Sequence, residues 1–169
     1  MSKSVPGGEF HVNDGKSLAA AGGRMYDLVF SFDSRVHADL DAIAAYIPQV
    51  VDLLAPRGLA FFHHSNLAAL GGVQYGHRSE DVSAEIFARL VKDAGGSVLC
   101  QERVAWGDVP ASDCFTLFVR SKAYPDAEMI DLGESSLLGV EAQLAAERFR
   151  FFHLHESDEG PGQVHGNAF

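Results

Sequence analysis

Apolar residues in the first half of the chain change from strand spacing to helix spacing and back. The run at 26–31 is continuously apolar at its centre, which is typical of a strand covered on both faces of a parallel sheet. From about Asp39 onward apolar residues recur every three or four positions, and Asp39 and Asp41 stand in a first turn where the helix dipole favours negative charge. A second strand is predicted at 59–62. The pattern therefore predicts a right-handed βαβ unit.

Proline and glycine mark where the predicted helices bend and end. Pro48 is predicted to kink the first helix, and Pro56-Arg57-Gly58 is predicted to end it and turn the chain into the next strand. A second helix is predicted after Ser79 or Asp81, because either side chain can cap its first turn. Gly95-Gly96 is predicted to stop that helix.

Further strands are predicted on both sides of this region. Two strand-like runs near 97–104 and 113–120 are separated by a reversal short enough for a hairpin. A short strand is also predicted at 9–12, before the turn signal Asn13-Asp14-Gly15. From Leu137 the spacing becomes helical again.

Length and charge restrict the classes of protein that fit. A chain of 169 residues that is 47% hydrophobic is long enough for one domain with a core and short for two. We expect a single domain over 1–155 and a poorly ordered tail over 156–169. The formal charge of −10 opposes binding to a phosphate backbone or an anionic membrane surface, so no nucleic-acid or membrane partner is expected.

The cysteines and the apolar runs indicate the compartment. Cys100 and Cys114 stand alone in separate strand-like runs, which fits a reducing cytosol. The first residues lack an apolar stretch of secretory type, and nowhere do about 18 apolar residues run together. The sequence therefore predicts a soluble, cytoplasmic protein.

A series of segments carries a resemblance to a known family. In order, the segments are 10–15, 26–37, 53–58 and 63–66, followed by the 83–96 helix, Gln101-Glu102 with Trp106-Gly107, and 113–116. Together they resemble class I S-adenosylmethionine-dependent methyltransferases, in particular bacterial members tied to sugar and secondary-metabolite O-methylation. The resemblance covers roughly residues 9–122, and the order of the segments is more specific than any one motif.

The resemblance implies an α/β fold with a Rossmann-like, mostly parallel sheet and an antiparallel C-terminal strand. The chain begins at what would be the family's third strand, and its Gly7-Gly8 and Gly22-Gly23 pairs lie in no strand–turn–helix context. We therefore expect a truncated domain that lacks the first two strands of the methyltransferase fold. Because those two strands are missing, we expect a gap in the sheet between the strands at 9–12 and 26–31. The strand at 26–31 would then have an open edge, available to a second copy of the chain in a homodimer or to a complementing partner.

The resemblance also implies a site for the cofactor S-adenosylmethionine. It places Asn13, Asp14 and Gly15 near the adenine, with the Asp14 carboxylate accepting a hydrogen bond from the adenine amino group. It places Phe32-Asp33-Ser34 where the methionine part of the donor and the methyl acceptor meet. Ordinary alternatives stay open, because Asp14 suits a turn before Gly15 and Asp33 suits a strand-end turn or a helix cap.

Histidines supply the candidate catalytic groups. Methyl transfer to a hydroxyl needs a group that accepts the proton, and His37 or His64 is the expected general base. His63, Ser65 and Asn66 are expected to position the acceptor. His63 and His64 point to opposite faces of a continuing strand, so at most one of them faces the cleft. A helix-terminal, packed or loop role is the alternative for each of these residues.

Metal chemistry is not expected. His153, His155 and Glu159 have the HxHxxxE spacing of a cupin-like site, but cupins are barrels of short strands, whereas this chain alternates strands with helices. Asp33, His37, His63 and His64 have no recognised metal-ligand spacing. No residue is therefore assigned as a metal ligand.

Two functions follow as expectations. The first is methyl transfer from S-adenosylmethionine to a hydroxyl of a sugar or small metabolite, with a small-molecule acceptor as partner. The alternative is a non-catalytic methyltransferase-like fragment or interaction subunit that binds no methyl donor.

Overall fold

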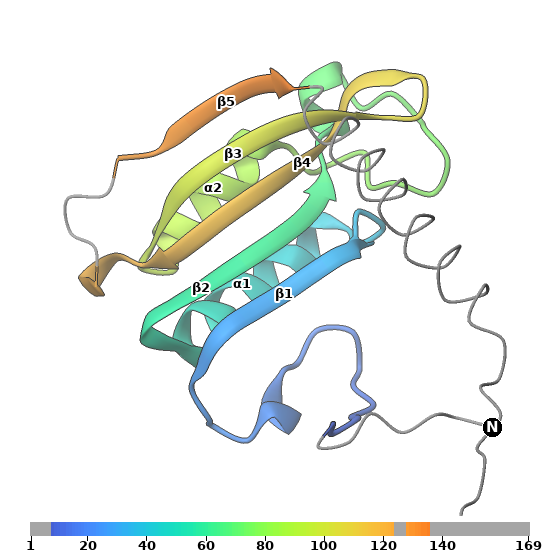
Figure 1. Cartoon of the computed structure of the whole chain (residues 1–169). Helices are drawn as coiled ribbons and strands as arrows, with labels where there is room; N and C mark the ends of the chain where they lie inside the picture. The colour runs from blue at the N-terminus through green and yellow to red at the C-terminus, as the bar shows by residue number, and fades with distance from the viewer. Residues whose placement is uncertain (1–7, 124–127, 136–169) are drawn as a thin grey trace, which may run out of the picture. The chain divides into compact units, whose positions relative to one another are not determined.

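The described residues form a five-stranded sheet. The computed structural model describes residues 8–123 and 128–135. The strands lie side by side in the order β1-β2-β4-β3-β5 (Figure 1). Their bounds are Tyr26–Arg35 for β1, Leu54–Ser65 for β2, Gly96–Trp106 for β3, Val109–Arg120 for β4 and Ile130–Ser135 for β5.

Four of these strands run in one direction. β1 pairs with β2 in parallel, and β3 pairs with β5 in parallel, whereas β4 is antiparallel to both β2 and β3. The predicted α/β fold with a mostly parallel sheet is therefore confirmed. The antiparallel strand is β4, the second arm of the predicted hairpin, and β5 follows it in the chain.

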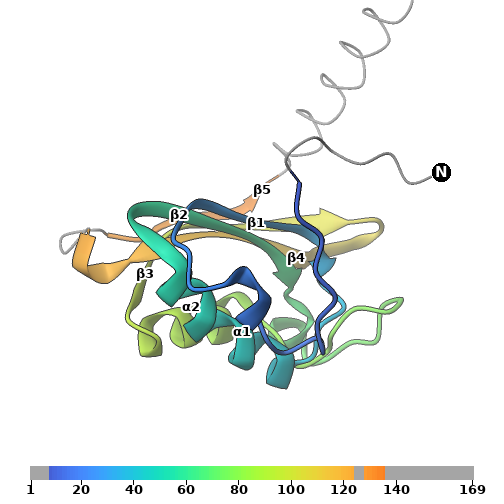
Figure 2. The ribbon, with the colours of Figure 1, turned by 90° about the horizontal axis from the view of Figure 1, so that it is seen from below.

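Both α-helices pack on the same face of the sheet. α1 spans Leu40–Leu53 and α2 spans Ala84–Asp93, and both lie below the sheet in Figure 2. The core lies between them and the strands, with Ile47, Phe62 and Phe87 buried in it. Burial of each such side chain contributes about 1.5–3 kcal/mol to stability. Short 3₁₀ turns occur at Ala19–Ala21, Leu67–Leu70 and Ser121–Ala123.

The first helix begins where the sequence predicts. Asp39 is its N-cap, and the Asp39 carboxylate accepts a hydrogen bond from the backbone N–H of Ala42 at 2.8 Å. Pro48 lies inside α1, where it removes one backbone donor. The βαβ unit formed by β1, α1 and β2 is therefore confirmed.

The predicted caps of the second helix are wrong. Ser83 caps α2, and its hydroxyl accepts a hydrogen bond from the N–H of Ile86 at 3.2 Å. Ser79 and Asp81 lie in the preceding loop and hold it against the start of α1. The Asp81 carboxylate accepts a hydrogen bond from the Leu40 N–H at 3.2 Å. Both side chains are suited to capping, but the loop turns into the helix only at Ser83.

The predicted strand at 9–12 is also wrong. Among the described residues no strand precedes β1, and Phe10 and Val12 are 79% and 100% exposed. A strand needs a partner for its backbone groups, and residues 8–123 and 128–135 provide none for this segment. The expected gap between 9–12 and β1 is therefore wrong too. Within the described sheet β1 is an edge strand, as predicted.

The turn predicted at Pro56-Arg57-Gly58 lies inside β2 instead. β2 begins at Leu54, directly after α1, and its pairing with β1 shifts register between Tyr26 and Leu28. A Cβ at Gly58 would lie 2.5 Å from the carbonyl oxygen of Tyr26, so the absence of a side chain permits this close approach.

Other predictions fall on residues outside those described. These are the helix from Leu137, the HxHxxxE segment at 153–159 and the tail at 156–169. All the described elements belong to one compact unit, residues 1–135. Across 8–123 and 128–135, no helix is long and apolar enough to cross a membrane.

Candidate functional site

The carboxyl end of β1 contains an unusual bend at Asp33. Its φ of 50° lies in the left-handed region, which few residues other than glycine adopt. The backbone N–H of Asp33 donates a hydrogen bond to Nδ1 of His63, at 3.1 Å. The pairing of β1 with β2 shifts register between Ser31 and Arg35, and this side-chain contact ties the shifted segment to β2.

His63 is part of a buried ionic cluster. Its Nε2 lies 2.8 Å from Oδ2 of Asp113, and both side chains are fully buried. Arg78 donates to the same carboxylate through Nε at 2.7 Å and Nη2 at 3.1 Å. Burial raises the pKa of Asp113, but the hydrogen bonds from His63 and Arg78 outweigh it and hold that pKa below its usual value. Because Nδ1 of His63 accepts from Asp33, Nε2 carries the proton and donates to Asp113.

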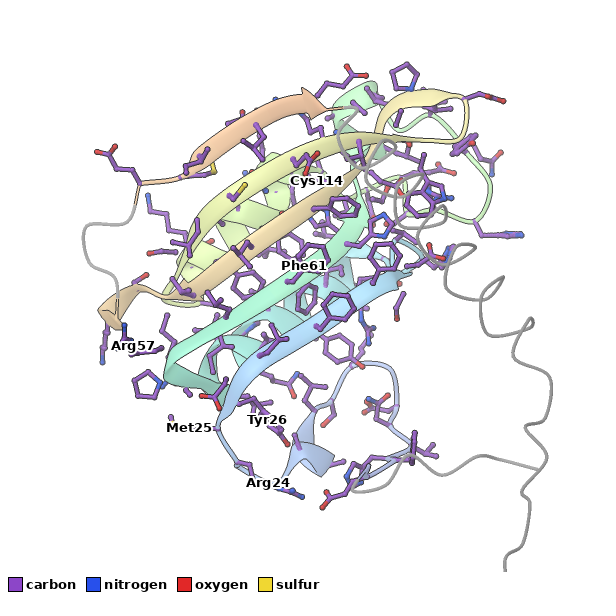
Figure 3. The ribbon with its side chains drawn as sticks, viewed as in Figure 1. Arg24, Met25, Tyr26, Arg57, Phe61 and Cys114 are labelled. Atoms are coloured by element: carbon purple, nitrogen blue, oxygen red, sulfur yellow. The ribbon has the colours of Figure 1, made fainter. Side chains whose placement is uncertain are left out.

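Aromatic rings surround His63 on the sheet face away from the helices. The rings of Phe32, Trp106 and Phe115 lie 5.0, 4.9 and 4.8 Å from the imidazole, centroid to centroid. Phe61, labelled in Figure 3, projects from β2 on this face and lies 5.5 Å from Phe115. Within the described residues no helix covers this face, and Phe32 is 42% exposed. The end of β1 therefore presents an aromatic surface next to the bend.

A groove follows the open edge of β1. It has a volume of about 370 Å³, and its lining includes Phe32, Ser34 and Arg35 from β1 and Tyr46 from α1. The Arg35 guanidinium stacks 4.0 Å above the centre of the Tyr46 ring. The groove thus begins at the bend and runs between the edge strand and α1.

The predicted adenine-binding loop is attached beside this groove. The Asn13 amide donates to the Tyr46 hydroxyl at 3.2 Å, which brings the loop within reach of Arg35. The backbone N–H groups of Lys16 and Ser17 donate to Oδ1 of Asp14 and hold its pKa below the usual value. The structure therefore places Asn13 on the same side of α1 as the β1 end.

His37 lies in the turn between β1 and α1. It is exposed, and its Nδ1 lies 3.0 Å from the carbonyl oxygen of His77. A carbonyl oxygen only accepts hydrogen bonds, so Nδ1 carries the proton and Nε2 has a free lone pair. His37 lines an open depression of about 400 Å³ that also includes Asp39, Arg78 and Asp81.

His64 lies on the opposite sheet face, as predicted. Its ring stacks on Phe87 at 4.0 Å, Nδ1 lies 2.8 Å from the Ser65 carbonyl oxygen, and Nε2 lies 2.9 Å from the Thr116 hydroxyl. Burial lowers the pKa of His64 to about 4. A fully buried imidazole with both nitrogens engaged is suited to packing, and the role of His64 as a base stays a prediction.

The three residues predicted to hold an acceptor have structural contacts instead. Asn66 accepts a hydrogen bond from the Ala84 N–H at the start of α2 and donates to the Ala111 carbonyl oxygen, each at 2.8 Å. The Ser65 hydroxyl donates to the Ser79 carbonyl oxygen. Together with His63, these side chains are buried and engaged within the protein, and their role in holding an acceptor stays a prediction.

Sequence reasoning missed Arg78 and Asp113 as members of the site. Asp113 opens the apolar run of β4, and a lone carboxylate in such a run signals a buried ion pair. The identity of its partner cannot be read from the sequence because Arg78 lies 35 positions away. Among the described residues no group of three potential metal ligands comes together.

Comparison with solved structures supplies a fold match. The crystal structure of a S-adenosylmethionine-dependent methyltransferase from Clostridium acetobutylicum matches 65% of this chain with a TM-score of 0.50 and 13% identity. The PH0226 protein from Pyrococcus horikoshii OT3 matches 66% of the chain and 59% of its own length, with a TM-score of 0.48 and 17% identity. The CcbJ methyltransferase from Streptomyces caelestis matches 59% of each chain, with a TM-score of 0.46 and 12% identity. No protein-family model and no curated protein matches.

The match to the clostridial protein shows the fold. Strands and helices of this chain are arranged as in part of that methyltransferase, in agreement with the resemblance found in the sequence. The match spans 63% of the length of the clostridial chain.

Proposed function

We propose that this chain takes part in S-adenosylmethionine-dependent methyl transfer to a hydroxyl of a sugar or small metabolite. The observation that carries the proposal is the carboxyl end of β1, where the Asp33 bend, the exposed Phe32 ring and the edge groove meet. In open α/β sheets, ligands bind beyond the carboxyl ends of the parallel strands. The fold match to a methyltransferase supports the interpretation of this strand end as a donor site.

Two residues near the groove, Phe32 and Asp14, are chemically suited to contact the methyl donor. When bound, S-adenosylmethionine supplies a methyl group attached to a positively charged sulfur. An exposed aromatic face attracts such a cation, and Phe32 offers one. The Asp14 carboxylate can accept from the adenine amino group through Oδ2, since its backbone contacts engage Oδ1. These residues account only for the part of a donor site beside β1. The sequence contains no glycine-rich turn in a strand–turn–helix context to hold the rest of the donor.

His37 is the proposed general base. The His77 carbonyl oxygen fixes its tautomer, so that Nε2 is free to take the proton from an acceptor hydroxyl. The ring is exposed beside the β1 end, where proton exchange with water is unhindered. Within the part of the chain that the structure describes, Nε2 of His37 makes no hydrogen bond that the reaction would break.

The alternative is a non-catalytic, methyltransferase-like interaction subunit. Its support is the open edge of β1 together with the exposure of Leu28, Phe30 and Phe32 along it, of which Phe30 is 64% exposed. An unpaired apolar edge strand favours addition of a further strand. A second copy of this chain, as in a homodimer, or a complementing polypeptide would provide that strand.

Titration calorimetry with S-adenosylhomocysteine separates the two functions. If the chain is catalytic, S-adenosylhomocysteine should bind with a micromolar dissociation constant, which corresponds to a binding free energy of about −8 kcal/mol. Asp14→Asn should weaken that binding, because an amide presents a poorer acceptor than a carboxylate, and the matched change Asp108→Asn in the exposed β3–β4 turn should not. A folded protein that gives no heat of binding would favour the interaction subunit.

Activity measurements test the role of His37. Once a hydroxyl acceptor is found by screening with radiolabelled donor, His37→Gln should lower kcat by about 10²–10⁴-fold, the usual contribution of a general base. Affinity for S-adenosylhomocysteine should stay the same. His11→Gln, at another exposed histidine, is the control and should leave both quantities unchanged. Equal activity of His37→Gln and the control would remove His37 from the proposal.

A further inference from the structure

The cluster of Arg78, Asp113 and His63 reaches the backbone at the end of β1. Its contacts form one chain of hydrogen bonds, from the Arg78 guanidinium to the Asp113 carboxylate, from Asp113 to His63 Nε2, and from His63 Nδ1 to the Asp33 N–H. The cluster joins the loop before α2, β4, β2 and β1. Nothing in the proposed chemistry requires it as a reactant, and its two central side chains are fully buried.

The left-handed backbone at Asp33 requires something to hold it. An aspartate in this region is less favourable than in extended backbone, so the bend persists only where surrounding contacts fix it. The hydrogen bond to His63 is the contact that the structure provides for the Asp33 N–H. Without that acceptor the N–H would lose its partner and the extended conformation would compete with the bend.

The charge of Arg78 allows His63 to act as an acceptor. A buried carboxylate needs a compensating positive charge. Arg78 supplies it through two hydrogen bonds. His63 donates to the same carboxylate through Nε2, which leaves the Nδ1 lone pair to accept from Asp33. A doubly protonated imidazole would instead direct a donor at the Asp33 N–H and break the contact.

We propose that His63 is a positioning residue that holds the β1 bend at Asp33, and that the Asp113–Arg78 pair keeps its ring in the tautomer able to do so. The effect of the bend on donor binding rests on the proposed function, because the bend positions Phe32, Asp33 and Ser34 at the proposed donor site. The hydrogen-bond chain itself stands on the geometry alone.

Two substitutions of His63 separate its two contacts. His63→Asn puts an amide oxygen near the position of Nδ1 and can still accept from Asp33. His63→Gln puts its amide nitrogen near the position of Nε2 and keeps a donor toward Asp113, but loses the acceptor for Asp33. The positioning role therefore predicts that the asparagine variant retains the bend and the glutamine variant does not.

Hydrogen exchange measured by NMR on the full chain gives the readout. In His63→Gln the Asp33 amide should exchange about tenfold faster than in the parent, as expected for loss of one hydrogen bond. The Ile43 amide, which bonds within α1 to Asp39, should be unaffected. In His63→Asn both rates should stay near those of the parent. Equal acceleration of both amides in His63→Gln, or identical rates at Asp33 in the two variants, would overturn the proposal.

Arg78→Gln provides a second test should His63→Gln fail to fold. Arg78 lies at the rim of the cluster, so its removal leaves the packing around His63 in place. Its loss should accelerate exchange at Asp33 and not at Ile43, because the Asp113 carboxylate that holds the His63 ring in place then loses two of its hydrogen bonds. An Asp33 rate equal to that of the parent would contradict the role given to the ion pair.

The affinity for S-adenosylhomocysteine distinguishes failure of this inference from failure of the proposed function. If the parent binds, His63→Gln should bind more weakly than His63→Asn. If the parent does not bind, the proposed function fails, and the exchange rates at Asp33 still decide whether His63 holds the bend.

Discussion

Protonation of His64 should make the fold sensitive to mild acid. This imidazole is fully buried between β2 and α2, and burial lowers its pKa from 6.5 to about 4. Above pH 6.5 the ring is neutral in both the folded and the unfolded chain, and its contribution to stability is fully present. As the pH falls below 6.5, His64 becomes protonated in the unfolded chain but stays neutral in the folded chain. Stability is therefore lost until the pH passes about 4, where His64 is protonated in the folded chain as well.

The size of this effect follows from the difference between the two pKa values. Linkage gives a loss of about 2 kcal/mol by pH 5 and about 3 kcal/mol by pH 4 from His64 alone. Asp113 contributes little to the loss above about pH 5. Its pKa in the folded chain lies below the ordinary aspartate value of 3.8, so the stability that it supplies begins to be lost only as the pH approaches that value, at the lower end of this window.

Urea unfolding followed by circular dichroism at a series of pH values measures the loss. The matched control is His64→Gln, which can keep a hydrogen bond to Thr116 but does not titrate. Its free energy of unfolding at pH 7.5 should be lower than that of the parent, and its dependence on pH between 6.5 and 4 should be weaker by the amounts above. If the free energies of unfolding of parent and variant depended on pH in the same way across this range, His64 would not be the cause of the loss.

Three further predictions concern packing and reactivity. Gly58→Ala should destabilise the fold by about 2 kcal/mol or more, measured by urea unfolding, because its Cβ would lie 2.5 Å from the Tyr26 carbonyl oxygen; an unchanged free energy would show that β2 can shift. Cys114, whose pKa is raised to about 12 by burial, should resist iodoacetamide at pH 8 in the folded protein, and mass spectrometry showing rapid alkylation would contradict its burial. Gln101→Leu should cost about 1–3 kcal/mol in urea unfolding, because its amide donates to the Ala84 carbonyl oxygen and to Thr116; a neutral result would indicate that these partners find other donors.

Periodicity was sufficient to predict the elements that depend on local sequence. The apolar spacing after Asp39 and the carboxylate that caps the helix both act within a few residues, and α1 begins at Leu40 accordingly. The apolar centre of β1 correctly predicted a strand, but the predicted cover on both of its faces is wrong for the described residues, since Leu28 and Phe30 are 58% and 64% exposed. The strand predicted at 9–12 failed because a strand depends on a partner, and no apolar pattern within that segment reveals whether one is present.

The site was predictable only in part, because its contacts are long-range. Phe32, Asp33 and His37 could be chosen because they follow a strand whose carboxyl end is a usual ligand position. The buried roles of His63 and His64 depend on Asp113 and Thr116, about 50 residues away, and only the folded sheet brings them together.

Mapping of S-adenosylhomocysteine onto the backbone amides by NMR shows whether the donor binds at the end of β1. We expect chemical-shift changes that saturate together at Asn13–Gly15, the loop bonded to Tyr46, and at Phe32–Ser34 beside the edge groove. Residues around Arg120 and Lys122, which line a separate cavity at the other end of the sheet, should be unaffected. An unchanged spectrum of the folded protein at high ligand concentration, or shifts confined to that other cavity, would contradict a donor site at the end of β1.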